Sequence, residues 1–339
     1  MIMLLWLLNL LLMVSAFFIY DINKPYNLHT SLIRKVSELA SFAIWIYFVR
    51  RRNKIKRILN KLFQLASDVQ CPLLTKVCCF TTILVPFVGW LATGWHLQEK
   101  SCKSLMKYYT LNAIAVHHNN SCIVAQPVML VYNLFRLALP TYFASMFVLL
   151  CNISRKLLRK HSSCTPMPIV GNSSSSFGNS LEQYFAQYWN LMIVLRSLEQ
   201  EMSFPLFVLQ LIDLAGLYGC LVRFANFDPN HSIKYHGAAV FMAARAILSL
   251  IFVNLAASSV NVADVKAREI NEELWQNLLF SGVTVKIEKA ISMLVYKGQS
   301  FAFTVWGCFR FTRKYILSTI ACSLTYSLLI VQMYSIAKV

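Results

Sequence analysis

The sequence is poor in charge, glycine and proline. Only 14% of its 339 residues are Asp, Glu, Lys or Arg, and it contains 10 Gly and 9 Pro. A soluble domain of this length carries about a quarter charged residues, so the composition excludes an ordinary soluble protein. Because Gly and Pro are scarce, the 57% of hydrophobic residues do not come from a linker or a fibre. The composition indicates a polytopic membrane protein.

Enzyme motifs are also missing from the sequence. It has no G-x-G-x-x-G, G-x-x-x-x-G-K-[ST], H-E-x-x-H or G-x-S-x-G motif, and its acidic residues do not pair in one loop. We therefore expect no catalysis and no cofactor. His117 and His118 are adjacent, so they point to different sides and lack a third ligand. We interpret them as loop histidines and expect no metal site.

Apolar runs recur along the chain, and most are long enough to cross a hydrocarbon core about 30 Å thick. They predict an all-α membrane protein with seven transmembrane helices, because a spanning segment must satisfy its own backbone hydrogen bonds. The first run lacks the positive n-region and cleavage site of a signal peptide, so we interpret it as an uncleaved span. The second is short and is expected to borrow residues before Arg34. The runs cover roughly residues 1–20, 36–49, 77–95, 128–151, 203–222, 236–260 and 315–335.

The distribution of Lys and Arg predicts the orientation of these spans. Most of the 32 basic residues follow the second, fourth and sixth runs, and the stretch RRRNKIKR at 50–57 is the densest group. Cytoplasmic loops keep the positive excess, so the N-terminus is expected inside and the C-terminus outside. The net charge of +18 follows from this bias and from attraction to anionic membrane lipid. We expect no nucleic-acid partner.

One predicted outer connection, residues 96–127, has features of a lumenal loop. Asn119 begins the sequon Asn-Asn-Ser, which is a glycosylation acceptor only on that side of the membrane. Cys102 and Cys122 share the loop and form either a disulfide or two unpaired thiols. The sequence leaves both alternatives open.

The predicted inner connections contain helical patterns as well as a linker. Residues 165–180 are rich in Ser, Gly, Asn and Pro, which predicts a flexible stretch. Apolar residues at helical spacing in 181–195 and 270–278 predict that the fifth and sixth spans continue as helices beyond the membrane. These extensions are expected to form a cytoplasmic helical anchor domain.

The segment before the last span contains an apolar stretch, Phe301 to Phe309, that is too short to cross a bilayer. It predicts a short buried helix leading into the final span. The expected division of the chain is therefore residues 1–260 for six transmembrane helices, 261–314 for anchor helices and this short pre-pore helix, and 315–339 for the seventh helix and C-terminus.

Asp213, Arg245 and Arg136 are charged residues inside the predicted spans, where charge is costly and usually faces a bundle interior or a wet cavity. Asp213 and Arg245 lie at similar depth in the fifth and sixth spans, which predicts a structural ion pair. Arg136 in the fourth span has no such partner in the sequence. With aromatic residues on other outer halves it suggests a ligand pocket open to the outside; the alternative is ordinary aromatic packing and an interfacial belt. The candidate ligand-binding residues are Trp90, Tyr132, Arg136, Tyr218 and Phe241.

The last apolar run carries a polar stripe. On a helix, Ser318, Cys322, Thr325, Leu329 and Gln332 fall on one face at steps of four and three. The stripe either packs against another helix through small and polar contacts or lines a water-filled pore. In a pore, Leu329 forms an apolar ring that gates by dewetting.

A resemblance favours the pore. The stretch TYSLLIVQM at 325–333 resembles the C-terminal signature of the insect gustatory receptors, and FAFTVWGCFRFTRKYILS at 301–318 is similar to the segment before that signature. Thr325, Tyr326 and Gln332 match the signature, whereas Met333 replaces its usual Phe. The chain also begins within the first run, without the cytoplasmic tail of most relatives.

This resemblance implies a tetrameric, ligand-gated, non-selective cation channel that detects a small-molecule tastant in the plasma membrane of sensory neurons. Leu329 and Gln332 then match the gate and filter positions of the family. The tetramer is either a homomer or a heteromer with related subunits. The alternatives are a seven-helix receptor or co-receptor subunit that signals through a partner, or a secondary transporter. The missing D-R-Y and N-P-x-x-Y patterns disfavour a G-protein-coupled receptor, and the missing internal repeat disfavours a transporter.

Overall fold

The structure is a computed structural model that describes residues 28–66, 72–94, 121–164, 174–225, 237–280 and 300–311. It also describes a few single residues outside these ranges, which are Leu11, Ser15, Cys102, Ser318, Ala321, Cys322, Thr325, Leu329 and Gln332.

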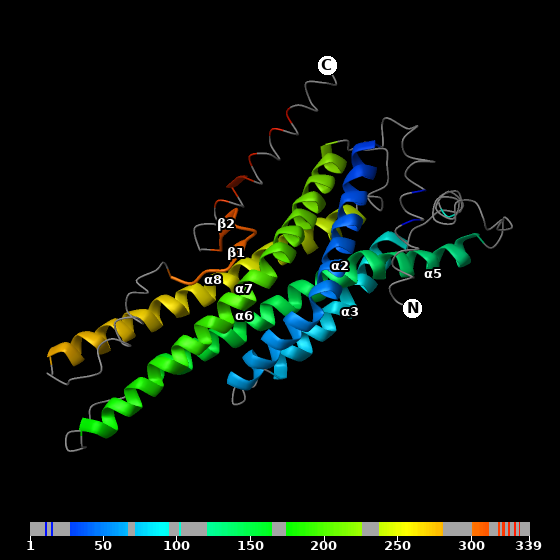
Figure 1. The fold of residues 1–339 in the computed structure, drawn as a ribbon. Helices are drawn as coiled ribbons and strands as arrows, with labels where there is room; N and C mark the ends of the chain where they lie inside the picture. Colours follow the sequence, from blue (N-terminus) through cyan, green and yellow to red (C-terminus); the bar gives the residue numbers. More distant parts are fainter. Residues whose placement is uncertain are drawn as a thin grey trace.

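Long helices make up most of the described chain (Figure 1). A short π-helix, η4, joins α5 to α6, and one small two-stranded sheet follows α8. The helices are α2 Leu28–Leu65, α3 Pro72–Gly94, α5 Ser121–Asn133, η4 Leu134–Ala138, α6 Leu139–Ser163, α7 Ser174–Ala225 and α8 Gly237–Phe280, and the strands are β1 Thr304–Val305 and β2 Phe309–Arg310.

Within the described residues, four helical stretches are long and apolar enough to cross a membrane: Pro72–Ala92, Ala125–Ser163, Glu182–Leu221 and Gly237–Leu274. They contain most of the third to sixth predicted spans, so a protein with several long apolar helices is confirmed. The first and seventh spans lie outside the described residues except for single positions. The total of seven spans and their orientation stay predictions.

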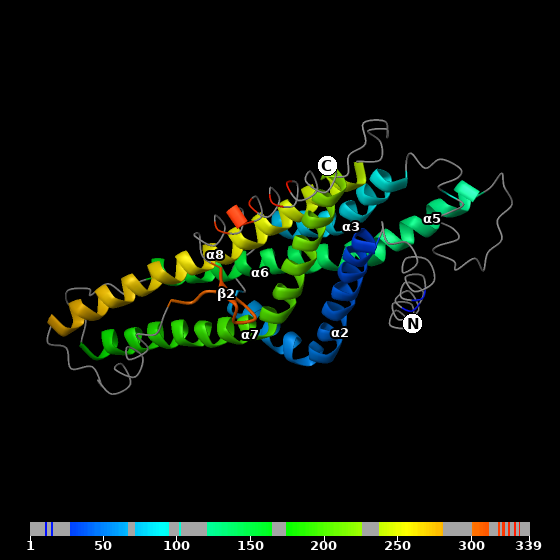
Figure 2. The same ribbon diagram turned by 90° about the horizontal axis from the view of Figure 1, so that it is seen from above.

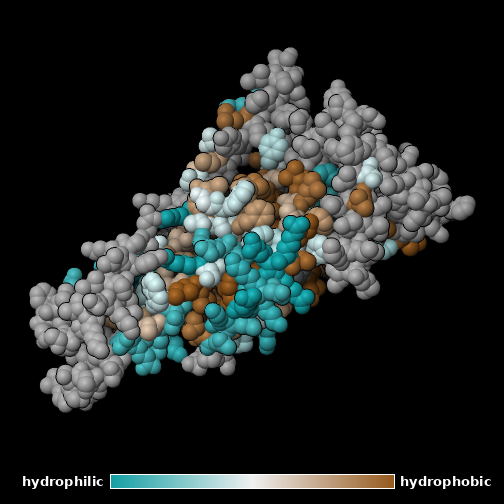
Figure 3. All heavy atoms as spheres, viewed as in Figure 1, coloured by the Kyte–Doolittle hydropathy of each residue, from teal (hydrophilic) through white to brown (hydrophobic). Residues whose placement is uncertain are grey.

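Helix α2 contains the second predicted span, and it begins before Arg34, as expected for a short run that borrows residues. The basic stretch 50–57 continues this helix. Its charged side chains are exposed, whereas Ile55 and Ile58 face inward. Figure 3 shows hydrophilic side chains gathered on this face beside apolar ones.

The helices form an elongated bundle in which α6, α7 and α8 run together toward one end (Figure 2). Helix α7 has 52 residues and α8 has 44. At about 1.5 Å per residue, each is at least about twice as long as a hydrocarbon core is thick. The prediction that the fifth and sixth spans continue as helices is therefore confirmed.

Helix α7 changes direction along its length (Figure 2). It contains Pro205, which lacks a backbone N–H and whose ring clashes with the carbonyl four residues earlier, so a bend is expected. The helix also begins at Ser174, inside the stretch 165–180 that was predicted to be flexible. Ser is a favoured residue at helix N-termini, so this part of the prediction was wrong.

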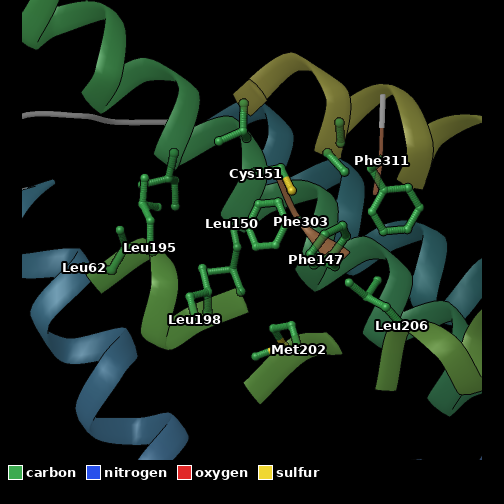
Figure 4. Close-up of a cluster of buried hydrophobic side chains, with 14 of the residues drawn as sticks. Leu62, Phe147, Leu150, Cys151, Leu195, Leu198, Met202, Leu206, Phe303 and Phe311 are labelled. Atoms are coloured by element: carbon green, nitrogen blue, oxygen red, sulfur yellow. The ribbon is translucent and has the colours of Figure 1, made fainter. Parts of the chain in front are cut away.

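The main apolar core lies where α2, α6, α7, α8 and the sheet meet. Figure 4 shows side chains from these segments directed toward one another, including Phe147 and Phe303. The rings of these two residues pack edge to face with centroids 5.1 Å apart. By contrast, α3 exposes large apolar side chains such as Leu73, Phe80 and Ile83, as expected for a lipid-facing helix.

Residues 301–311 form a hairpin, so the predicted short buried helix over Phe301–Phe309 is wrong. Strands β1 and β2 pair antiparallel, with Val305 opposite Phe309. Burial alternates with a period of two, because Phe301, Phe303 and Val305 are buried and the residues between them are half-buried. That alternation belongs to a strand. The turn contains Trp306 and Gly307 with positive φ of 45° and 72°.

Replacing Gly307 tests this turn. A β-branched residue is strained in the left-handed region, so Gly307→Val is expected to lower the free energy of unfolding by roughly 1–2 kcal/mol. Gly307→Asn is the matched control, because Asn enters this region more readily. Thermal unfolding of the detergent-solubilised protein measures both variants. Equal stability of Val and Asn at this position contradicts a positive φ at Gly307.

Candidate functional site

Arg136 lies at the centre of the π-helix η4, in the fourth predicted span. Pro140 follows at the start of α6. Because proline lacks a backbone N–H, the carbonyl of Arg136 has no α-helical hydrogen-bond donor four residues later. This gives a local reason for the change from π to α geometry. Single π-helical turns of this kind occur frequently at functional sites.

Asp213 on α7 and Arg245 on α8 lie together, with Arg245 Nη2 3.5 Å from Asp213 Oδ1. The side chains are 0% and 6% exposed. One turn along α7, a Cβ on Gly216 would lie 3.7 Å from the Cβ of Ala246. Small residues at this crossing let the two helices approach closely. The pair therefore holds α7 against α8 inside the bundle.

Phe241 contributes to a crossing of three elements at Gly89 on α3. A Cβ at Gly89 would lie 2.6 Å from Leu137 Cδ1 and 3.0 Å from Phe241 Cε1. A larger residue here would require the Leu137 side chain on η4 to shift. Trp90, the next residue, donates from Nε1 to the carbonyl of Gln126 at 3.1 Å. The structure thus brings Trp90, the Arg136 segment and Phe241 to neighbouring positions.

The other two candidates are Tyr132, one turn before Arg136, and Tyr218 on α7. Tyr132 is buried and donates its hydroxyl to Glu38 Oε1, which links α5 to α2. Glu38 also pairs with Lys35 at 3.3 Å. Tyr218 is exposed on α7. Tyr132 thus forms a bond between two helices and Tyr218 is exposed, and the role of both in ligand binding stays a prediction.

Sequence reasoning missed Glu38 and Gln210. Both are buried polar residues in apolar helices, at 9% and 3% exposure. The signal for Glu38 was present, because a carboxylate inside a predicted span needs a partner. Gln210 lies one helical turn before Asp213, but an uncharged amide is easily overlooked in an apolar run.

A second polar cluster centres on Asp264 of α8, which is fully buried. Its Oδ1 accepts from the Tyr188 hydroxyl at 2.8 Å. Its Oδ2 accepts from Arg268 Nε at 3.0 Å and from the backbone N–H of Phe301 at 2.7 Å. A single carboxylate therefore joins α7, α8 and the start of the hairpin.

Further hydrogen bonds fix the hairpin on both sides. On α8, Asn261 Nδ2 donates to the Phe301 carbonyl at 2.7 Å. On α7, Ser203 Oγ accepts from the Trp306 N–H at 2.6 Å, and Glu199 accepts from the Thr304 hydroxyl. The hairpin is thus bonded to both long helices immediately before the stripe begins.

The stripe residues Ser318, Cys322, Thr325, Leu329 and Gln332 are helical and exposed in the single chain. Leu329 is 48% exposed. The Thr325 hydroxyl donates to the carbonyl of Ala321 at 3.0 Å, one turn earlier. Tyr326 and Met333 of the signature lie outside the described residues.

Cys102 is buried and disulfide-bonded. The side chain of Cys122 lies outside the described part of the chain, so the pairing of the two stays a prediction. Asn119, His117 and His118 also lie outside it. Among the described residues, no group of three or more His, Cys, Asp or Glu is placed to hold a metal ion.

Comparison with known proteins gives a structural relationship. No protein-family model and no curated protein matches the chain. The solved structure of the insect olfactory receptor OR5 from Machilis hrabei superimposes with a TM-score of 0.72. The match covers 97% of this chain and 87% of the receptor, at 14% identity.

The fold is that of an insect olfactory receptor. This confirms an all-α helical membrane protein with several long apolar helices. The matched protein is an olfactory receptor by name. At 14% identity the olfactory-receptor fold alone is shared, and the gustatory assignment stays a proposal.

The Asp213–Arg245 pair gives a stability prediction. Arg245→Met leaves a buried carboxylate without its counter-charge, which costs about 3–5 kcal/mol. The double variant Asp213→Leu/Arg245→Met removes both charges and is expected to recover most of that loss. Melting temperatures of the purified variants measure the coupling. The ion pair is contradicted if the double variant loses as much stability as Asp213→Leu and Arg245→Met lose in sum.

Proposed function

We propose that the chain is a subunit of a gustatory receptor, a tetrameric ligand-gated cation channel that detects a small-molecule tastant. The proposal places it in the plasma membrane of a sensory neuron, either as a homotetramer or with related subunits. Two supports are the olfactory-receptor fold over 97% of the chain and the signature-like stretch at 325–333.

The observation that carries the proposal is the exposed stripe on the last apolar run. Thr325 and Gln332 are polar and exposed although they lie in a segment long enough to span lipid. A row of polar side chains in a spanning helix usually packs against other helices or lines a water-filled path. We therefore expect this face to be covered by other helices or by water. Four copies around a central axis provide both neighbouring helices and water, because the four stripes then face one another across a water-filled pore.

The hairpin supports this proposal mechanically. It is bonded to α7 through Ser203 and to α8 through Asp264 and Asn261. A ligand that shifts α7 or α8 thereby moves the segment that leads into the stripe. In this proposal the pocket lies around Arg136, Trp90 and Phe241, and the hairpin transmits its occupation to the pore.

Leu329 tests the gate. Four leucine side chains exclude water because they offer it no hydrogen bonds. Leu329→Ser wets this ring and is expected to raise the current recorded without ligand. Leu328→Ala is the control, since the preceding residue lies about 100° away around a helix. Basal whole-cell current, normalised to surface protein, is the measurement. An unchanged current in Leu329→Ser channels that reach the surface contradicts the gate.

Gln332 tests the selectivity of the same path. Gln332→Glu adds negative charge to the pore and is expected to raise the permeability to calcium relative to sodium, whereas Gln332→Lys is expected to lower cation current. Reversal potentials under bi-ionic conditions measure this ratio. If the stripe only packs against helices, the ratio stays constant and the variants differ only in surface level.

A further inference from the structure

Several buried donors around Arg136 and Arg245 have no acceptor among the described residues. Both guanidinium groups have an Nε without a hydrogen bond, although these atoms are shielded from solvent. Buried N–H groups are normally satisfied, because an unsatisfied one costs about 1–3 kcal/mol. A further hydrogen-bond acceptor would satisfy these two Nε atoms.

The charges in this region do not balance. Arg245 pairs with Asp213, and the positive charge of Arg136 acts on Arg245 as well. In the described part of the chain no carboxylate forms an ion pair with Arg136. The three side chains together carry two positive charges and one negative charge, which leaves one positive charge in an apolar bundle.

The other buried carboxylate near this segment is already engaged. Glu38 pairs with Lys35 and accepts from the hydroxyl of Tyr132, one turn before Arg136. The Lys35–Glu38 pair carries no net charge, so it does not offset the charge on Arg136.

Gln210 adds an independent observation. It is 3% exposed, and neither its amide nitrogen nor its amide oxygen has a hydrogen-bond partner among the described residues. It lies three residues before Asp213, on the same face of α7. Ser249, one turn beyond Arg245 on α8, has a buried hydroxyl beside Asp213. The unmet polar atoms therefore gather around the ion pair.

We propose that this region binds a small apolar molecule carrying one carboxylate, with the carboxylate between Arg136 and Arg245 and the amide of Gln210 beside it. The proposal deepens the proposed function, because it names the chemical class of the ligand. Guanidinium groups bind carboxylates through two parallel hydrogen bonds. The apolar part of the ligand lies toward Leu137 and Phe241, which meet at Gly89.

Binding to the purified full-length protein in uncharged detergent tests the ligand class. The probes are octanoate and benzoate, each compared with its methyl ester, which has the same skeleton and no charge. Each acid is expected to bind at least about tenfold more tightly than its ester, as measured by calorimetry. Equal binding of acid and ester, or no binding of either acid, overturns the proposal. This comparison needs no variant.

Variants then locate the site. Arg136→Gln is expected to abolish the preference for the acid, and Arg136→Lys to retain part of it. Arg155→Gln is the matched control, because Arg155 is a half-buried arginine on α6 that also has an unbonded Nε. Its acid-to-ester ratio is expected to equal that of the unchanged protein. Equal effects of Arg136→Gln and Arg155→Gln overturn the assignment to Arg136.

A phospholipid phosphate offers the same anionic oxygens, so the measurement is repeated in phosphatidylcholine nanodiscs. Octanoate binding in both media supports a small-molecule carboxylate. Binding in detergent that disappears in nanodiscs supports the same anion site with lipid as its occupant. Octanoate binding without any evoked cation current contradicts the proposed channel and leaves the site standing. Currents evoked equally by acids and esters support the channel and overturn the site.

Discussion

The buried carboxylate of Asp264 connects the parts of the molecule on which the proposed mechanism depends. It accepts hydrogen bonds from Tyr188 on α7, Arg268 on α8 and the backbone of Phe301. A charge removed from solvent persists only when such partners stabilise it. Because one partner is the backbone N–H of Phe301, the same interaction that satisfies Asp264 also fixes the start of the hairpin.

The two polar regions of the bundle differ in how completely they are satisfied. Around the hairpin, Asp264 has three donors, and Asn261 and Ser203 each bond a hairpin backbone group. Around Arg136, by contrast, Gln210 and both arginine Nε atoms lack partners among the described residues. A fully bonded region is suited to transmit a displacement, whereas a region with unmet donors is suited to gain energy from a ligand. This contrast supports ligand binding near Arg136 and coupling through the hairpin.

Much of the architecture was predictable because lipid limits the choices of the chain. Apolar runs of sufficient length must become helices there, and the structure has helices over the third to sixth runs. The Asp213–Arg245 contact could also be predicted, since opposite charges at equal depth in neighbouring spans stabilise each other. Tyr132 was harder to interpret: its aromatic ring suggested a pocket, but its hydroxyl bonds Glu38 on a helix distant in sequence.

The sequence by itself determined that this is a helical membrane protein, where the long helices run, and that a polar stripe follows one face of the last apolar run. Only the tertiary structure decided that residues 301–311 form a hairpin. The local apolar run was too short to distinguish helix from strand, and its backbone partners, Asp264, Asn261 and Ser203, come from α7 and α8. The same holds for Gly89, whose lack of a side chain matters only because Leu137 and Phe241 meet there. Hydrogen bonds and close contacts between distant segments have no local signature, whereas the transfer of apolar side chains into lipid is a property of each segment alone.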